Sequence, residues 1–128
     1  MFQNLDVFQY ANAMARHAGQ RQAIVAQNIA NADTPGYSAR DVVPFETLVK
    51  GAEGGGTLRA TRGNHLHGSQ GVAKGEIIGA HLHTSDPNEN SVSLETEMLK
   101  SIEVQRQHQR ALTIYKSSMN VLRAVIGR

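Results

Sequence analysis

The sequence predicts a mainly α-helical protein, in which two long terminal helices pair as a coiled-coil hairpin joined by a glycine-rich middle loop. Two observations carry this prediction. All three prolines and ten of the twelve glycines lie between Pro35 and Pro87, so the helix-breaking residues are confined to the middle. Both flanking arms repeat apolar residues at alternating spacings of three and four, as coiled coils do. The 128 residues are therefore expected to form one structural unit, with an N-terminal helix in 1–34, a middle segment in 35–90 and a C-terminal helix in 91–128.

The N-terminal arm is expected to form one helix from about residue 5 to residue 31. Its apolar repeat, here called the N-terminal stripe, is built mainly of alanine and is interrupted only by Gln22. A partner helix can approach such a stripe closely but buries little area per layer, so the chain is expected to need partners to become fully ordered. The stripe consists of Phe8, Ala11, Ala15, Ala18, Gln22, Val25, Ile29 and Ala32.

The C-terminal arm repeats this pattern. Ser91 or Ser93 can cap the start of the helix, and Glu95 and Glu97 lie near the positive end of its dipole. Gly127 is a plausible stop. Two polar residues interrupt the repeat, a device that can fix the register of paired helices. The repeat, here called the C-terminal stripe, consists of Met98, Ile102, Gln105, His108, Leu112, Tyr115, Met119, Leu122 and Ile126.

The middle segment contains short strand-like runs instead of long periodic ones. Residues 57–61 and 76–79 can each form a strand, and both are flanked by glycine. The glycines at 54–56 lack the Lys-Ser/Thr ending of a phosphate-binding loop. The middle is therefore expected to be a loop that holds one short β-hairpin.

Composition excludes several classes of function. The net charge is +2 with a pI near 9.2, but the basic residues are not concentrated, and aromatic residues do not alternate with them as nucleic-acid stacking requires. The absence of cysteine excludes disulfides and thiolate metal sites. No apolar run reaches the roughly 20 residues of a membrane span, and the first ten residues do not resemble a Sec-type signal peptide.

Catalytic and cofactor motifs are missing, so we expect no enzyme and no cofactor. The sequence has no G-x-S-x-G, H-E-x-x-H or G-x-G-x-x-G motif. Two H-x-H pairs, His65 with His67 and His81 with His83, are the only candidate metal ligands. Their alternative interpretation is that they are surface histidines of a polar loop.

The most informative segment lies where the first helix must end. Thr34 precedes Pro35 and is thereby pushed out of the helical region, and Pro35-Gly36 suits the centre of a type II turn. Asn28 and Asn31 are poor residues for a helix interior. Either they serve the helix end, or their amides hydrogen-bond to neighbouring helices and fix register, and the residue pattern leaves both interpretations open.

This segment resembles the N-terminal signature of bacterial flagellar rod and hook proteins, most closely the proximal rod proteins. The resemblance runs through Asn28-Ile29-Ala30-Asn31-Ala32-Asp33-Thr34-Pro35-Gly36-Tyr37 and continues into Ala39-Arg40-Asp41. A second match, to the start of that family's C-terminal helix, covers Asn90-Ser91-Val92-Ser93-Leu94-Glu95 with Glu97-Met98. Ser91-Val92-Ser93 departs from the more usual acidic residue at this turn.

The resemblance implies a structural subunit of the basal-body rod in the periplasm, exported by the flagellar type III apparatus without a cleaved signal. It implies that the terminal helices pack as a coiled coil lining the axial tube and link the membrane ring to the distal rod. The implied partners are further copies of the chain, other rod proteins, the membrane-ring and rod-base adaptor proteins, and the export apparatus. Two alternatives stay open: a periplasmic metal-binding protein that uses the histidine pairs, and a helical adaptor that forms no filament.

Two groups of residues are expected to mediate assembly. The assembly motif is Asn28, Ile29, Asn31, Asp33, Thr34, Pro35, Gly36 and Tyr37. The assembly seam takes the apolar members of both stripes, namely Phe8, Ala11, Ala15, Ala18, Val25, Ile29, Met98, Ile102, Leu112, Tyr115, Met119, Leu122 and Ile126.

Overall fold

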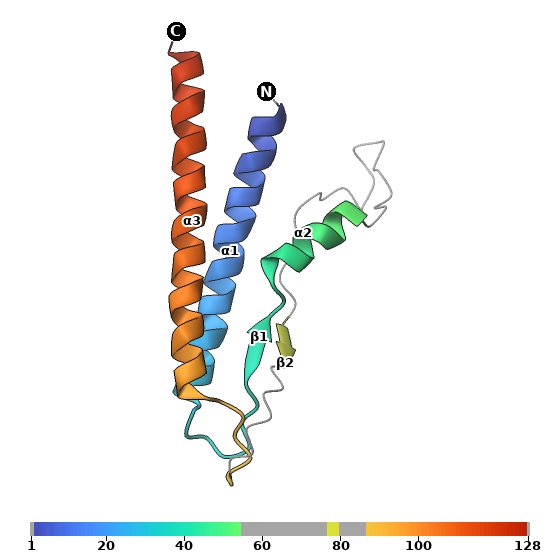
Figure 1. The fold of residues 1–128 in the computed structure, drawn as a ribbon, viewed down its shortest axis with the longest axis vertical. Coiled ribbons are helices and arrows are strands. Elements are labelled where there is room, and N and C mark those ends of the chain that lie inside the picture. The colour runs from blue at the N-terminus through green and yellow to red at the C-terminus, as the bar shows by residue number, and fades with distance from the viewer. Residues whose placement is uncertain (1, 55–76, 80–86, 128) are drawn as a thin grey trace, which may run out of the picture.

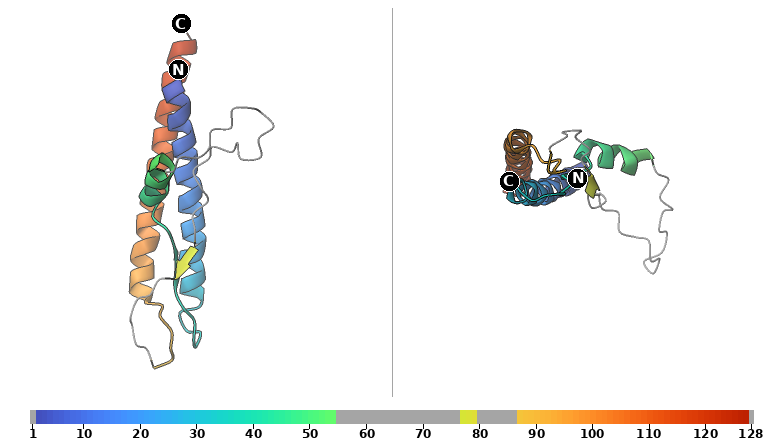
Figure 2. Two further views of the ribbon diagram at one scale, coloured as in Figure 1. Left: turned by 90° about the vertical axis from the view of Figure 1, so that its right-hand side faces the viewer. Right: turned by 90° about the horizontal axis from the view of Figure 1, so that it is seen from below.

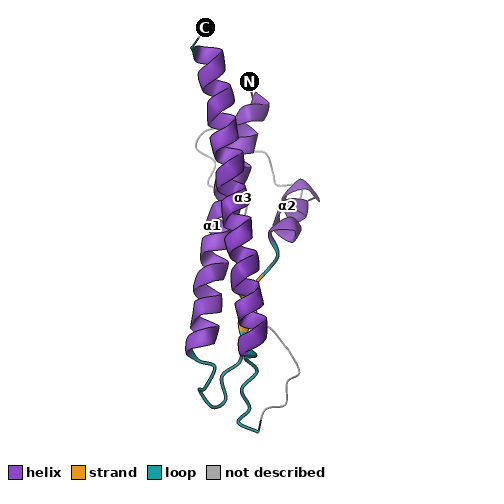
Figure 3. Ribbon diagram, turned by 60° about the vertical axis from the view of Figure 1, so that its left-hand side comes forward, coloured by secondary structure: helices purple, strands orange, loops and turns teal. Residues whose placement is uncertain are grey.

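Two long antiparallel helices dominate the computed structural model, which describes residues 2–54, 77–79 and 87–127. The elements in chain order are α1 (Phe2–Ala30), β1 (Arg40–Val42), α2 (Phe45–Gly54), β2 (Ile77–Gly79) and α3 (Leu94–Ile126). Helices α1 and α3 lie side by side in all three ribbon views, with both termini at one end (Figures 1, 2 and 3). We call that end the open end, and the other, where α1 ends and α3 begins, the closed end. The expected fold class is therefore confirmed.

The predicted break after the first helix is present. Helix α1 ends at Ala30, and the Tyr37 N–H donates to the Thr34 carbonyl at 3.3 Å. Gly36 has a φ of 71°, in the left-handed region that the third residue of a type II turn requires. The turn residues thus do what the pattern predicts.

The N-terminal stripe faces α3. Ala11, Ala18 and Val25 recur every seven residues and are at most 3% exposed. Two other members of the stripe identify the partner: the Phe8 ring lies 5.3 Å from the Tyr115 ring, and the Gln22 amide donates to the Ser101 hydroxyl at 3.3 Å. The α3 side of this contact likewise buries few large apolar side chains, so the two helices approach closely and bury little area.

The C-terminal stripe, in contrast, does not pack the hairpin together as its periodicity suggested. The residues of α3 that are buried are Glu97, Val104 and Ala111, again spaced by seven. Met98, Ile102 and Leu112 are 54%, 50% and 43% exposed. At about 100° per residue, Met98 and Leu112 lie on a flank of the helix, one residue past a buried position, and Ile102 lies on the side opposite the contact. Only near the open end does the C-terminal stripe approach α1.

The middle differs from expectation in two respects. Ile77–Gly79 is a strand, but it pairs antiparallel with Arg40–Val42, which was not predicted, and residues 57–61 lie outside the described part of the chain. Helix α2 was not predicted either. It begins directly after Pro44, which suits a helix start, and Phe45, Leu48 and Val49 are spaced for one apolar face.

The flank of α1 next to its α3-facing side holds this middle segment. His17, 5% exposed, lies close enough to the Val43 carbonyl for a hydrogen bond from Nε2 at 2.7 Å, and its ring lies 5.6 Å from that of Phe45. Farther along the same flank, Asn28 bonds the backbone of Arg40. Helix α1 is thus the central element, with α3 on one side and β1 and α2 on the adjoining flank.

Candidate assembly site

A cluster of buried and half-buried polar side chains joins the elements at the closed end, and we call it the polar junction. It consists of Arg21, Asn28, Tyr37, Asp41, Asn90, Glu97 and Lys100, drawn from α1, the turn, β1, the segment before α3 and the start of α3. Polar groups of this kind are stable in an interior only when their hydrogen-bonding groups are satisfied. The contacts below show that they are.

Asn28 is the centre of the polar junction and is completely buried. Its Nδ2 donates to the Arg40 carbonyl at 2.6 Å and to Glu97 Oε2 at 3.0 Å. Its Oδ1 accepts from the Arg40 N–H at 3.1 Å and from the Tyr37 hydroxyl at 3.3 Å. One amide thereby binds both backbone groups of a β1 residue, the ring that follows the turn, and the first turns of α3.

Glu97 carries the only carboxylate in the described part of the chain that is fully buried. Its second oxygen, Oε1, accepts from Lys100 Nζ at 2.8 Å. Lys100 Nζ also lies 3.4 Å from Asp41 Oδ2, and Asp41 Oδ1 accepts from Arg21 Nε at 3.0 Å. The charges therefore alternate along a chain of ion pairs from α3 to β1 to α1, which leaves the buried carboxylate compensated.

The pKa values of the two central groups reflect this arrangement. Burial alone would raise the pKa of Asp41, but hydrogen bonds from Arg21 and from the Val42 N–H, with the charges of Arg21 and Lys100, lower it below its ordinary range. Burial alone would lower the pKa of Arg21, but Asp41 and Glu103 raise it. Both groups are held in their charged forms.

Asn90 fastens the turn to the segment that precedes α3. It is 3% exposed, and its Nδ2 lies within 3.0 Å of three carbonyl oxygens, those of Asn31, Ala32 and Thr34. Its Oδ1 accepts from the Val92 N–H at 2.8 Å. The next residue, Ser91, accepts from the Ala39 N–H at 2.8 Å instead of capping α3. Ser93 occupies the N-cap position but makes no side-chain cap bond.

The assembly motif separates into inward-facing and outward-facing members. Asn28 is buried, and Ile29, Asn31 and Tyr37 are half-buried. The other members, Asp33, Thr34, Pro35 and Gly36, are exposed at the tip of the closed end. Of the two interpretations of the asparagines, Asn28 reaches across to α3, whereas the Asn31 amide donates only to Gln27 of its own helix, at 2.8 Å.

Sequence reasoning missed Asn90, Asp41, Arg21 and Lys100 as members of the polar junction. Most of their partners are 20 to 59 residues away along the chain, and only Lys100 has a local ion-pair partner, Glu97 three residues before it. The acidic residue Glu97 was noticed only for its place near a helix start. Two signals were present: Asp41 closes the first of the two segments that resemble the rod family, and Asn90 opens the second.

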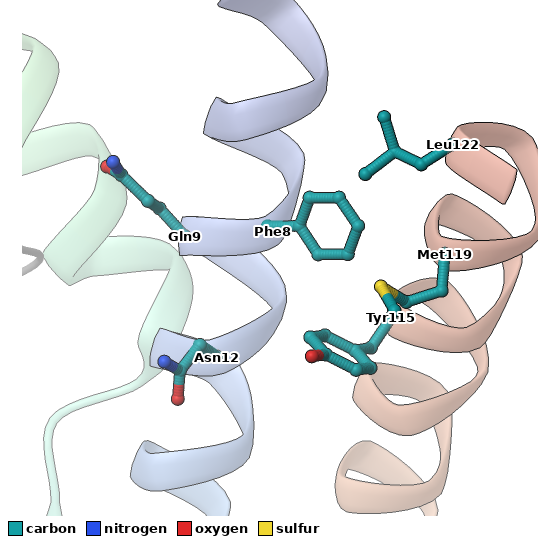
Figure 4. Close-up of a pocket in the computed structure, with 6 residues that line it drawn as sticks. All are labelled: Phe8, Gln9, Asn12, Tyr115, Met119 and Leu122. Atoms are coloured by element: carbon teal, nitrogen blue, oxygen red, sulfur yellow. The ribbon is translucent and has the colours of Figure 1, made fainter. Parts of the chain in front are cut away.

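At the open end, an open apolar groove lies between the two helices (Figure 4). Phe8 points from α1 toward α3, where Tyr115, Met119 and Leu122 surround it. Gln9 and Asn12 form the polar rim on α1. The open end therefore has no counterpart of the polar junction among the described residues, and the hairpin is fastened at one end only.

The four histidines proposed as metal ligands, His65, His67, His81 and His83, lie outside the described residues. Among the helices that the structure does describe, none combines the length and apolar content needed to cross a bilayer.

Comparison with known proteins identifies the family. A family model described as "Flagella basal body rod protein" matches residues 11–37, the part of α1 and the turn that contains Asn28. The chain is 30% identical to the flagellar basal body rod protein FlgB of Agrobacterium fabrum, over 98% of this chain and 96% of that protein. It is 35% identical to the FlgB of Salmonella typhimurium, over 80% of this chain and 83% of that one. Rod subunits are structural proteins of the basal body, and a buried polar junction that fastens a helical hairpin fits that role. The chain belongs to the flagellar basal-body rod protein family.

Proposed function

We propose that the chain is a structural subunit of the proximal rod that the flagellar type III apparatus exports and that polymerises through its two terminal helices. In the periplasm it would contact further copies of itself, other rod proteins, and the membrane-ring and rod-base adaptor proteins, and so link the membrane ring to the distal rod. Family membership supports the rod itself, and the physical features of the hairpin support polymerisation.

One observation carries the proposal: nine large apolar side chains along α3, here called the apolar row, stay more than 40% exposed in the single chain, although the Tyr115 ring also contacts Phe8. These side chains lie on more than one face of the helix. Exposed apolar surface of this extent marks an interaction site, here one open to more than one neighbour. Each of the following side chains is between 43% and 77% exposed: Leu94, Met98, Leu99, Ile102, Leu112, Tyr115, Val121, Val125 and Ile126. Five members of the assembly seam, Met98, Ile102, Leu112, Tyr115 and Ile126, belong to this row.

The thin contact between α1 and α3 supports the same conclusion. Most of its buried side chains are alanine and valine, which bury far less area than leucine or phenylalanine. An antiparallel helix pair with so small a core needs neighbours to become stable along its whole length. The polar junction meanwhile fixes how the two helices meet, so that each copy presents the same surface to its neighbours.

The small buried core is consistent with export of the chain in an unfolded state. A chain with no disulfides and a small core has little to unfold before it passes a narrow channel. The apolar row would then be covered only when the subunit reaches the growing rod.

A charge placed in the apolar row tests the proposal. Leu112→Asp should allow secretion of the chain but prevent rod assembly, because the carboxylate would be buried and unpaired between subunits, at a cost of several kcal/mol. Asn120→Asp is the matched control, because it adds the same charge at an exposed position eight residues farther along that belongs to neither the assembly seam nor the apolar row. Secreted protein, swimming and electron microscopy of basal bodies should be measured for both. Normal rods with Leu112→Asp would overturn the proposal.

A further inference from the structure

Acidic and basic side chains lie in different halves of α3, and this separation bears on how neighbouring copies align. In residues 87–103 the exposed acids are Glu89, Glu95 and Glu103, and from residue 104 to residue 127 the sequence contains no acid at all. The second half carries Arg106, Arg110, Lys116 and Arg123, all exposed. The first half of α3 is therefore acidic and the second half basic.

Four of these residues share one outer face of the helix. At about 100° per residue, Glu95, Glu103, Arg106 and Arg110 fall within roughly 80° of the helix circumference. This outer face points away from α1, because the residues of α3 that meet α1 are Glu97, Val104 and Ala111. Leu99, which lies on the same face between the two acids, is 66% exposed.

The outer face is electrostatically unsatisfied within one chain. Neither Arg106 nor Arg110 forms an ion pair or a side-chain hydrogen bond with any other described residue, and the same holds for Glu95. Glu103 has one weak contact, with Arg21 Nη1 at 3.5 Å, and its side chain remains 67% exposed. The outer face thus offers an acidic and a basic half, separated along the helix axis, with an uncovered leucine.

We propose that adjacent copies contact each other through this outer face in parallel but axially staggered, so that Glu95 and Glu103 of one copy lie against Arg106 and Arg110 of the next. The inference rests on the proposed function, since it takes the polar, parallel arrangement of a rod as given. Two parallel copies in register would place acid on acid and base on base, whereas a stagger pairs opposite charges and covers Leu99. A heterologous contact of this kind does not close on itself and can propagate.

The spacing of the residues sets the size of the stagger. Glu103 and Arg110 are seven residues apart, and Glu95 and Arg110 are fifteen apart. At ~1.5 Å per residue, pairings in this range correspond to an axial shift of roughly 10 to 22 Å between neighbouring copies.

Cysteine cross-linking can measure this shift, because the natural chain contains no cysteine. In rods assembled from the variant chains, Leu99→Cys combined with Gln109→Cys, or Leu99→Cys combined with Thr113→Cys, should give disulfide-linked ladders in at least one of the two pairs. A disulfide requires Cβ atoms within about 4.5 Å, so the productive pair reports the stagger. Leu99→Cys alone should give no dimer. A dimer from Leu99→Cys alone, or no ladder from either pair, would overturn the inference.

Charge reversal supplies the second test. Arg106→Glu with Arg110→Glu makes the whole outer face acidic and should abolish the ladder. Adding Glu95→Arg and Glu103→Arg to that variant restores two complementary halves and should restore the ladder. Lys116→Glu with Arg123→Glu changes the charge equally on a different face and should leave the ladder intact, which is the matched control.

The outcomes separate the two proposals. Normal rods and an unchanged ladder in the Arg106→Glu, Arg110→Glu variant would overturn the staggered contact while leaving the rod function standing. Cross-links that join Leu99→Cys to a different rod protein, and never to a second copy, would also overturn it. Failure of the natural chain itself to form rods would instead remove the proposed function.

Discussion

Replacing Asn28 by aspartate changes one buried NH2 group into an oxygen and tests whether the polar junction holds the hairpin together. The change removes the donor of two hydrogen bonds, to the Arg40 carbonyl at 2.6 Å and to Glu97 Oε2 at 3.0 Å. It also places a second carboxylate against Glu97, and both positions are 0% exposed. Two buried carboxylates at such a distance cannot both remain ionised, so they must share a proton.

The expected loss of folding free energy comes mainly from keeping that shared proton bound at neutral pH. Holding a carboxyl group of ordinary pKa about 4 protonated at pH 7 costs about 4 kcal/mol, since each pKa unit is worth 1.36 kcal/mol. The lost bond to Arg40 adds about 1 kcal/mol. We therefore expect Asn28→Asp to lower the free energy of unfolding by about 5 kcal/mol at pH 7, which is comparable with the whole stability of a small domain. The deficit should shrink to about 1 kcal/mol near pH 4, where carboxyl groups bind protons in the unfolded chain too.

Urea unfolding of the isolated chain, followed by far-ultraviolet circular dichroism at both pH values, measures this difference. Asn31→Asp is the matched control, because the Asn31 amide donates only to Gln27 in its own helix and the change should cost no more than ~1 kcal/mol. Adding Glu97→Gln to Asn28→Asp reverses donor and acceptor across the same gap, so it should recover at least ~2 kcal/mol. A loss below ~0.5 kcal/mol for Asn28→Asp at pH 7, or no recovery in the double variant, would refute the reasoning.

Three further predictions concern the turn, the ion pairs and the open end. Gly36→Val should impair rod assembly more than secretion, because a β-branched residue resists the φ of 71°, whereas Gly36→Asn should be tolerated; normal rods with valine would contradict the turn assignment. Asp41, whose folded-state pKa is lowered, stabilises the fold above its ordinary pKa of 3.8 and loses that contribution as the pH falls through the lowered value. Acid titration should therefore show a weaker loss of stability for Asp41→Asn than for the natural chain, and identical curves would count against the ion pairs. In the isolated chain the ends of the two terminal helices at the open end should be largely unfolded at micromolar concentration, while the polar junction keeps the closed end folded. Amide exchange should therefore be fast at the open end, and a fully helical monomer would contradict this.

The two terminal helices could be predicted because their signals are local. Apolar residues at alternating spacings of three and four define each helix, and Pro35 with Gly36 ends the first one near the residue at which the structure ends it. The positive φ of Gly36 was likewise predictable, because it depends on the turn type and on no distant contact. Helix α2 also carried local signals, Pro44 at its start and the spacing of Phe45, Leu48 and Val49, which the glycines that follow them obscured.

The strands and the polar junction could not be predicted, because they depend on residues that only the fold brings together. Strand β1 has three residues, too few to show a period of two, and its partner begins 35 residues after it ends. Asn28 and Glu97 are 69 residues apart, and nothing near either one indicates that it is completely buried.

The C-terminal stripe shows most clearly what the periodicity of a sequence cannot predict. Periodicity determines which side chains share a face of a helix, but it does not determine what covers that face. In the tertiary structure α1 meets the neighbouring face, with Glu97, Val104 and Ala111, because Glu97 must reach Asn28 and small side chains allow the two helices to approach. The larger apolar side chains of α3 are thereby left on the surface, so the sequence determined that they form a stripe, and only the packing of the whole chain decided that the stripe does not belong to the hairpin's own core.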